Sequence, residues 1–169
     1  ARLELLHVQV KTIPAVAEIA TGRARIDEVR QVAIEELLGR ESVAPDKALL
    51  SACIRGKSVL VTGAGGSIGS ELCRQILRQA PLRLVLFEVS EYALYRVEQE
   101  LQGMAAKLGG RVEMVPLLGS VTDQAHVQAV LRAFGVQTVY HAAAYKHVPL
   151  VEHNVIEGVR NNVFGTWCV

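Results

Sequence analysis

The chain has 169 residues, enough for one domain or for one domain with a fragment of another. Hydrophobic residues make up 50% and charged residues 21%, which excludes a disordered chain. The formal net charge of +1 gives no reason to expect nucleic acid or an anionic membrane surface as the main partner. No apolar run approaches the roughly 20 residues that cross a bilayer. The three cysteines form no Cys-x-x-Cys pair and fit a reducing compartment, so we expect a cytoplasmic location.

The first residues lack an initiator Met and the pattern of a signal peptide, so we expect an interior piece of a longer chain. Residues 8–13 predict a short strand, and Pro14 begins a predicted helix that ends at Gly22. A second helical pattern, with a stop at Gly39, runs through Val29, Ile34, Leu37 and Leu38.

A polar stretch with one proline follows and predicts a domain boundary. We interpret residues 1–40 as the tail of an upstream domain, residues 41–56 as a linker and residues 57–169 as a separate domain. A tail of this length is too short for a convincing core of its own.

Strands and helices alternate in the third region. The predicted strands cover residues 58–62, 83–87, 112–118 and 136–141. Short connections imply right-handed crossovers and a parallel sheet. The sequence therefore predicts an α/β fold with a truncated Rossmann-type sheet of strand order 3-2-1-4. Pro116 predicts that the third strand lies near a sheet edge.

The predicted helices have apolar faces that point to the sheet. The first carries Ile68, Leu72 and Ile76. The second begins after a Ser90 cap, ends at Gly109-Gly110 and has an inner face of Leu94, Val97, Leu101, Met104 and Leu108. The third, with a Thr122 cap, carries Val127, Val130, Leu131 and Phe134. The last runs from about Pro149 to Val163.

A glycine loop joins the first strand of this region to its helix. Gly63, Gly66 and Gly69 have the spacing Gly-x-x-Gly-x-x-Gly, with Gly65 as an extra glycine. Such glycines permit a tight turn, close approach of a pyrophosphate and close packing of helix on strand. The N–H groups of about Gly66 to Ile68 then face the phosphates from the helix N-terminus. A tight strand–helix turn without a ligand is the alternative interpretation.

Glu88 ends the second strand of this region, where a carboxylate accepts both ribose hydroxyls of adenosine and repels a 2′-phosphate. Val89 follows, at a position where an NADP site often has a basic residue. NAD is therefore favoured over NADP, although Arg96, on the next helix, leaves NADP open. A solvated loop acid is the alternative for Glu88. After the third strand, Ser120 Oγ or the Val121 backbone is expected to meet the adenine edge, and Asp123 to support the helix start.

From Gly56 to Thr166 the sequence resembles the extended short-chain dehydrogenase/reductase superfamily, and most of all the CapD-like bacterial polysaccharide-biosynthesis dehydratases and epimerases. The resemblance rests on residues 56–77, 86–101, 118–123, 139–154 and 161–166, of which HAAAYKHVPLVE is the most specific part. VKTIP and EELLGR also resemble the segment that joins an upstream domain to the catalytic one in membrane-anchored members.

The resemblance implies an NAD(P)-dependent reaction on a UDP-sugar, of the UDP-N-acetylglucosamine 4,6-dehydratase type, in surface polysaccharide synthesis. Hydride passes from sugar C4 to the nicotinamide, water leaves across C5 and C6, and hydride returns to C6. The resemblance also implies a homo-oligomer and, for anchored members, a place on the cytoplasmic face of the inner membrane.

The resemblance carries specific residues over to this chain. Cofactor contacts are expected from Gly63, Gly65, Gly66, Ser67, Ile68, Gly69, Glu88, Ser120, Val121, Ala142, Ala143 and Ala144. Substrate contacts are expected from Lys146 and His147, with a surface lysine and ordinary packing as the respective alternatives. Asn162 matches a superfamily asparagine that supports the active site. No metal site is expected, because the spacing of His147 and His153 suits none.

Two features depart from the superfamily pattern. Ser120 stands where many members have an aspartate for the adenine amino group. No Tyr-x-x-x-Lys occurs in the chain, so no catalytic residue is assigned within it. A non-catalytic nucleotide-binding module, or another extended short-chain oxidoreductase or epimerase, remain alternative interpretations.

We expect the isolated 169-residue chain to show no turnover, because the catalytic cluster of the superfamily is not among its residues. Incubation of the purified chain with UDP-N-acetylglucosamine and NAD, followed by chromatography of the sugar nucleotides, checks this. Measurable consumption of the substrate contradicts it.

Overall fold

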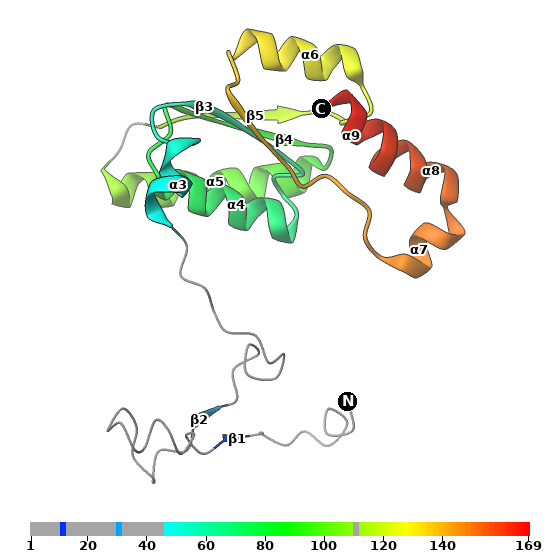
Figure 1. Cartoon of the computed structure of the whole chain (residues 1–169), viewed down its shortest axis with the longest axis horizontal. Coiled ribbons are helices and arrows are strands. Elements are labelled where there is room, and N and C mark those ends of the chain that lie inside the picture. Colours follow the sequence, from blue (N-terminus) through cyan, green and yellow to red (C-terminus); the bar gives the residue numbers. More distant parts are fainter. Residues whose placement is uncertain (1–10, 13–29, 32–45, 110–111) are drawn as a thin grey trace. The chain divides into compact units, whose positions relative to one another are not determined.

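The computed structural model describes residues 11–12, 30–31, 46–109 and 112–169 (Figure 1). The chain divides into two compact units, Ala1–Pro45 and Asp46–Val169. In the first unit, β1 (Lys11–Thr12) pairs antiparallel with β2 (Arg30–Gln31). The strand predicted for residues 8–13 contains β1. The helix predicted around Val29 is wrong at Arg30 and Gln31, because their backbone pairs with β1; its remaining residues and the helix predicted from Pro14 lie outside the described residues.

The second unit contains a four-stranded, all-parallel sheet. Its strands are β3 (Ser58–Thr62), β4 (Arg83–Glu88), β5 (Glu113–Leu118) and β6 (Thr138–His141). Their spatial order is β5-β4-β3-β6, which confirms the predicted order 3-2-1-4. β5 lies at one edge of this sheet, as Pro116 predicts, since proline has no N–H to donate to a second neighbour.

The strand register brings four chain segments to one end of the sheet. Thr62, the last residue of β3, pairs with Phe87 of β4 and with His141 of β6. Glu88 of β4 pairs with Leu118 of β5. The carboxyl ends of all four strands therefore end side by side, which is the edge where ligands bind in open parallel sheets.

The sheet lies between two helical layers (Figure 1). α4 (Ser67–Arg78) and α5 (Glu91–Leu108) cover one face, where their side chains pack against Val59, Val61, Leu84 and Leu86. α6 (Gln124–Ala133) covers the other face, where its side chains pack against Leu60, Val85 and Phe87. The central strands are buried on both faces, which explains their almost wholly apolar sequences. α3 (Lys47–Ala52), capped by Asp46, precedes β3.

Two residues assigned to inner helix faces are exposed instead. Ile68 is 61% exposed and Leu108 is 54% exposed. On α4 the buried face is formed by Gly69, Cys73, Ile76 and Leu77. A Cβ on Gly69 would collide with the carbonyl oxygen of Gly63, so this glycine is the closest point between helix and loop. Gly69 therefore sets the rotation of α4 and turns Ile68 outward.

Both ends of α5 agree with the sequence, whereas the cap of α6 does not. Ser90 Oγ accepts a hydrogen bond from Ala93 N at 3.4 Å, and Gly109, with φ +65°, ends α5. The predicted Thr122 cap of α6 is wrong. The carboxylate of Asp123 caps the helix by accepting from His126 N at 3.0 Å, while the Thr122 hydroxyl contacts Ser120 Oγ at 2.8 Å.

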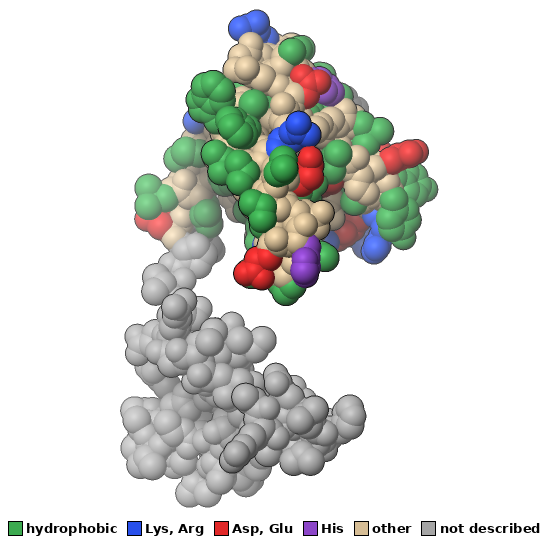
Figure 2. All heavy atoms as spheres, turned by 90° about the vertical axis from the view of Figure 1, so that its right-hand side faces the viewer, with side chains coloured by type: hydrophobic (Ala, Val, Ile, Leu, Met, Phe, Trp, Pro, Cys, Tyr) green, Lys and Arg blue, Asp and Glu red, His purple; other side chains and the backbone are tan. Residues whose placement is uncertain are grey.

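The last predicted helix is not continuous. It consists of α7 (Val148–His153), α8 (Val155–Val159), the π-helical segment η2 (Arg160–Phe164) and α9 (Gly165–Cys168). Asn154, with φ −132° and ψ 50°, leaves the helical region and separates α7 from α8. Figure 2 shows hydrophobic side chains exposed on this side of the molecule; those of α7 to α9 include Leu150, Ile156, Phe164 and Trp167. No helix in the described part of the chain combines the length and apolar character of a membrane span.

Gly69→Ala is expected to lower the free energy of unfolding by about 1–3 kcal/mol, because its Cβ would collide with Gly63 and force the backbone apart. Gly103→Ala is the matched control, since the space around Gly103 in α5 is open. That change should raise the free energy of unfolding by about 0.5–1 kcal/mol through helix propensity. Urea denaturation measures both; a Gly69→Ala variant as stable as the control contradicts the packing described.

Candidate functional site

A cavity of about 250 Å³ lies at the carboxyl ends of the strands. Its walls come from the segments that follow all four strands of the sheet and from the first turn of α5. The lining residues are Gly63, Gly65, Gly66, Phe87, Glu88, Val89, Ala93, Gly119, Ser120, Val121, Ala142, Ala143, Ala144, Tyr145 and Asn161. Residues from the ends of all four strands therefore form the cavity, and not the glycine loop alone.

The glycine loop has conformations and contacts that require glycine at specific positions. Gly63 has φ +63°, and a Cβ there would lie 2.8 Å from the carbonyl oxygen of Ala142 and from the backbone nitrogen of Ala143. Gly66 has φ −71°, and a Cβ there would meet only the carbonyl oxygen of Gly63, at 3.3 Å. Gly63 thus lets the loop lie against the end of β6, whereas Gly66 lines the cavity without a side chain.

The first turn of α4 presents backbone N–H groups without partners. Gly66 N donates to Gly63 O at 3.0 Å, so this amide closes the turn and is not free. Gly66 provides no side-chain cap, and none of the described residues accepts a hydrogen bond from the N–H groups of Ser67, Ile68 or Gly69. Unpartnered amides at a helix N-terminus, together with the helix dipole, form a site for an anion.

Glu88 connects the glycine loop to the start of α5. Its Oε2 accepts from Gly65 N at 3.0 Å, and its Oε1 accepts from Val89 N at 2.9 Å and from Ser90 N at 3.1 Å. The residue is only 8% exposed and lines the cavity, which is inconsistent with a solvated loop acid. Oε1 already accepts two N–H groups and Oε2 accepts one, so Glu88 can still accept one hydroxyl from a ligand in the cavity, through Oε2.

Gly65, the extra glycine of the loop, is required by packing. A Cβ on Gly65 would lie 2.5 Å from the Cβ of Ala93. Because Gly65 and Ala93 both lack bulk, the loop reaches the carboxylate of Glu88, and the first turn of α5 forms part of the cavity wall.

The turn after β5 forms another part of the wall. Gly119 N donates to Glu88 O at 2.9 Å, and a Cβ on Gly119 would collide with the ring of Phe87. Ser120 and Val121 line the cavity, and Val121 is buried. The Ser120 hydroxyl also accepts from Thr122 N at 3.2 Å, so it is oriented within its own turn.

Two asparagines hold the segment that follows β6. The Asn162 side chain accepts from Tyr145 N and donates to Tyr145 O, both at 2.9 Å. Asn161 Nδ2 donates to Ala143 O at 3.2 Å and to Asn162 Oδ1 at 3.0 Å. Both asparagines belong to the π-helical segment η2, and such segments often mark functional sites. They hold the backbone at Ala143 and Tyr145, within the segment Ala142 to Tyr145 that lines the cavity.

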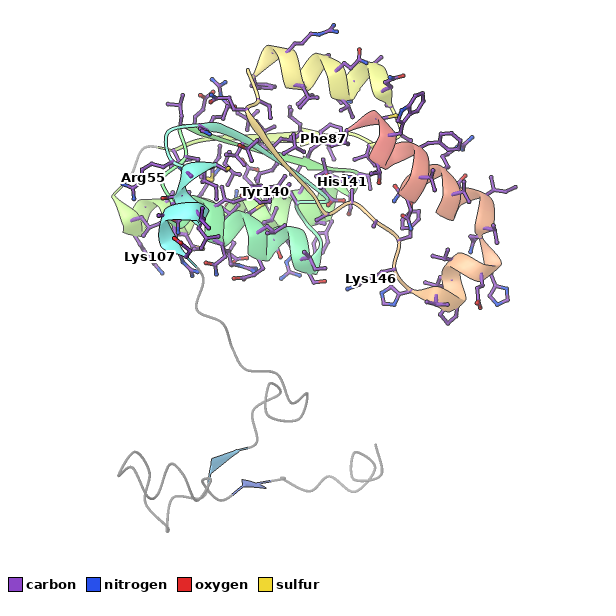
Figure 3. The ribbon with its side chains drawn as sticks, viewed as in Figure 1. Arg55, Phe87, Lys107, Tyr140, His141 and Lys146 are labelled. Carbon is purple, nitrogen blue, oxygen red and sulfur yellow. The ribbon has the colours of Figure 1, made fainter. Side chains whose placement is uncertain are left out.

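His141 joins the end of β6 to β3 and to α9. Its Nδ1 lies 2.7 Å from Thr62 Oγ1 and its Nε2 lies 3.1 Å from Thr166 Oγ1. Because Thr166 donates to Asn162 O, Nε2–H of His141 donates to Thr166 and Nδ1 accepts from Thr62. Desolvation lowers the pKa of His141, which is consistent with this neutral tautomer. Figure 3 labels His141 at the strand end and Lys146 on the segment that leads to α7.

A second cavity of about 520 Å³ adjoins the first and shares Ala144 and Tyr145 with it. The predicted substrate residues Lys146 and His147 both line this second cavity. The other lining residues come from α7, α8 and Asn154 between them; they are Leu150, Val151, Asn154, Glu157 and Gly158. The two predicted sites are therefore neighbours along one surface.

The predicted cofactor residues line the first cavity, except Ser67, Ile68 and Gly69, which lie in the first turn of α4. Six lining residues were not among the predicted cofactor contacts: Phe87, Val89, Ala93, Gly119, Tyr145 and Asn161. Asn161 had a signal, because it forms a pair of asparagines with Asn162 in a segment that carries the resemblance. Ala93 had none beyond its small size next to the Ser90 cap.

Residues 59–169 match a family model described as "Polysaccharide biosynthesis protein". The chain belongs to this family. It is 40% identical over 159 residues to the capsular polysaccharide biosynthesis protein CapD of Staphylococcus aureus, a match that covers 94% of this chain and 26% of that protein. The chain thus spans about a quarter of the length of this curated relative.

Sugar-nucleotide enzymes are more distant relatives. A UDP-N-acetylglucosamine 4,6-dehydratase (inverting) of Campylobacter jejuni is 27% identical over 111 residues, which cover 65% of this chain and 30% of that protein. The solved structure of a UDP-glucose 4-epimerase from Bifidobacterium longum, in complex with NAD+ and UDP, is 28% identical, with a TM-score of 0.53. The match covers 66% of this chain and 31% of the epimerase chain. The family is therefore related to sugar-nucleotide dehydratases and epimerases.

Acidification below about pH 6.5 is expected to destabilise the chain through His141. In the unfolded chain the His141 imidazole binds a proton near this pH, whereas in the folded chain its lowered pKa disfavours protonation. Lowering the pH from 7.5 to 5.5 should therefore reduce the free energy of unfolding more for the wild type than for His141→Gln. Urea denaturation across this range measures it. A difference that does not change with pH contradicts the assignment.

Proposed function

We propose that the chain binds NAD at the carboxyl ends of β3 to β6, as the cofactor-binding part of a sugar-nucleotide 4,6-dehydratase or epimerase. One observation carries this proposal: the free N–H groups of Ser67, Ile68 and Gly69 lie at the start of α4, next to a cavity to which all four strand ends contribute. Peptide amides in this arrangement suit the pyrophosphate of a dinucleotide. The bound NAD supplies a hydride acceptor and donor.

The fit extends along the whole cavity. The carboxylate of Glu88 lies in the wall with one lone-pair direction left, on Oε2, for a hydroxyl of the adenosine ribose, and its charge favours NAD over NADP as the dinucleotide. Ser120 and Val121 suit the adenine edge. Ala142, Ala143 and Ala144, in a segment that Asn161 and Asn162 hold at Ala143 and Tyr145, offer backbone without bulky side chains to the nicotinamide half.

We propose the adjoining cavity as the place of a UDP-sugar. Lys146 provides a cation for a phosphate or sugar hydroxyl, and His147, Asn154 and Glu157 provide further polar groups in the same wall. Support comes from the dehydratase and epimerase relatives, whose names specify UDP-sugars. Of the two reactions, we propose 4,6-dehydration of UDP-N-acetylglucosamine, in the synthesis of a capsule or O-antigen.

The role of this chain's own residues is to bind and orient, since no Tyr-x-x-x-Lys occurs in the sequence. For the whole protein we propose a homo-oligomer in the cytoplasm. If an upstream region anchors the protein, we propose that it lies on the cytoplasmic face of the inner membrane. The membrane location rests on the resemblance of VKTIP and EELLGR to the joining segment of anchored members, and the homo-oligomer rests on the resemblance to the family.

Gly66→Ala tests the cofactor site. Its Cβ fits the observed φ of −71° and would lie 3.3 Å from Gly63 O, on a residue that lines the cavity, so NAD should bind at least about tenfold more weakly while folding is retained. Gly103→Ala, at an open position of α5, should bind NAD as the wild type does. Isothermal titration calorimetry with NAD measures the affinities, and circular dichroism checks the fold. Folded wild-type chain that binds no NAD overturns the proposal.

A further inference from the structure

The charged side chains of the second unit differ in sign between the two ends of its sheet. A helix that connects two parallel strands runs back against them, so each helix ends near the amino ends of the strands. The last turns of α4, α5 and α6 carry the basic residues Arg78, Lys107 and Arg132. The carboxyl end carries the acids Glu88 and Glu91 instead. Because these charges offset one another, the small net charge of the chain does not reveal its basic end.

Backbone hydrogen bonds bring two further cations to the amino end of the sheet. Gly56 N donates to Ala80 O, and Leu82 N donates to Lys57 O, both at 3.0 Å. The segment before β3, which contains Arg55 and Lys57, therefore lies against the turn that joins α4 to β4. Its two cations extend the basic end beyond the helix termini.

The five cations at this end are available to bind an anion. Lys57 is half-buried and the other four are exposed. None of the five lies within salt-bridge distance of an acid in the described part of the chain. Glu113, at the start of β5, is already paired with Arg83 at 2.7 Å. Figure 3 labels Arg55 and Lys107 toward the same end of the sheet.

Two exposed leucines lie beside these cations. Leu82, 60% exposed, is hydrogen-bonded to Lys57, and Leu108, 54% exposed, follows Lys107. Helix dipoles explain a basic residue in the last turn of a helix, but they do not explain leucines in water. Cations interspersed with exposed apolar side chains are typical of surfaces that lie on anionic lipid headgroups. A purely ionic partner would bind the cations and leave both leucines in water.

We propose that this amino-end surface docks on an anionic membrane. The surface consists of Arg55, Lys57, Leu82, Arg78, Lys107, Leu108 and Arg132. Lipid phosphates bind its cations, and the two leucines enter the boundary between headgroups and acyl chains. The contact is a property of the second unit, needs no upstream anchor and does not depend on the proposed NAD site. It leaves the cavity at the opposite end of the sheet open to nucleotides from the aqueous phase.

Co-sedimentation of the 169-residue chain with lipid vesicles tests the docking surface. The chain should bind vesicles that contain phosphatidylglycerol but not vesicles of phosphatidylcholine alone, and about 0.5 M salt should weaken the binding. The Arg55→Gln/Lys107→Gln double variant should bind the anionic vesicles about twentyfold more weakly, because each cation near such a surface contributes about fivefold. Leu82→Ala should bind at least about threefold more weakly, since less apolar area enters the bilayer.

The Arg96→Gln/Arg160→Gln double variant is the matched control, because it removes the same net charge from exposed positions outside the amino-end surface. It should bind within about twofold of the wild type, and circular dichroism checks that each variant is folded. The proposal is overturned if the folded wild type does not bind anionic vesicles, if both double variants weaken binding equally, or if Leu82→Ala binds as the wild type does. Wild type that binds immobilised poly-aspartate but no vesicles also overturns it, in favour of an acidic protein partner.

Discussion

Gly69 packs against the carbonyl group of Gly63, and Gly63 packs against the backbone of Ala142 and Ala143; each contact exists because the glycine that makes it lacks a Cβ. A side chain on Gly69 would collide with Gly63 O, and one on Gly63 would press on the backbone of Ala142 and Ala143. These contacts join three segments: the end of β3, the start of α4 and the segment that leaves β6. The orientation of the free α4 amides toward the sheet edge depends on them, and so does the wall formed by the alanines.

Polar side chains around the cavity act mainly on backbone groups. Glu88 accepts from three amides, Asn162 binds both polar groups of the Tyr145 peptide, and Asn161 holds Ala143 O. His141 continues this pattern between β3 and α9. These side chains therefore fix the shape of the cavity, while the groups left to contact a ligand are largely peptide N–H groups and small side chains. Such an arrangement suits a cofactor that brings its own reactive group.

The sheet was predictable because its signals are local and strong. Apolar runs buried on both faces mark β3 and β4, and short connections between alternating elements require parallel order. Glu88 and the alanines could be placed at the strand ends for the same reason. Features that depend on contacts between distant segments were not predictable. The exposure of Ile68 follows from the contact of Gly69 with Gly63, and the participation of Ala93 follows from the approach of Gly65. The break at Asn154 and the π-helical segment with Asn161 have no periodic signal, since their apolar residues continue the helical pattern.

Amide chemical shifts test the central claim most directly, because they report on the proposed phosphate contacts one residue at a time. In a folded, isotope-labelled chain, addition of NAD should move the N–H resonances of Ser67, Ile68 and Gly69 most, since these amides have no partner among the described residues. Resonances of the exposed end of α5, such as Lys107, should stay unchanged. Saturating NAD that leaves the three α4 amides unmoved in a folded chain contradicts a dinucleotide site at this corner of the sheet.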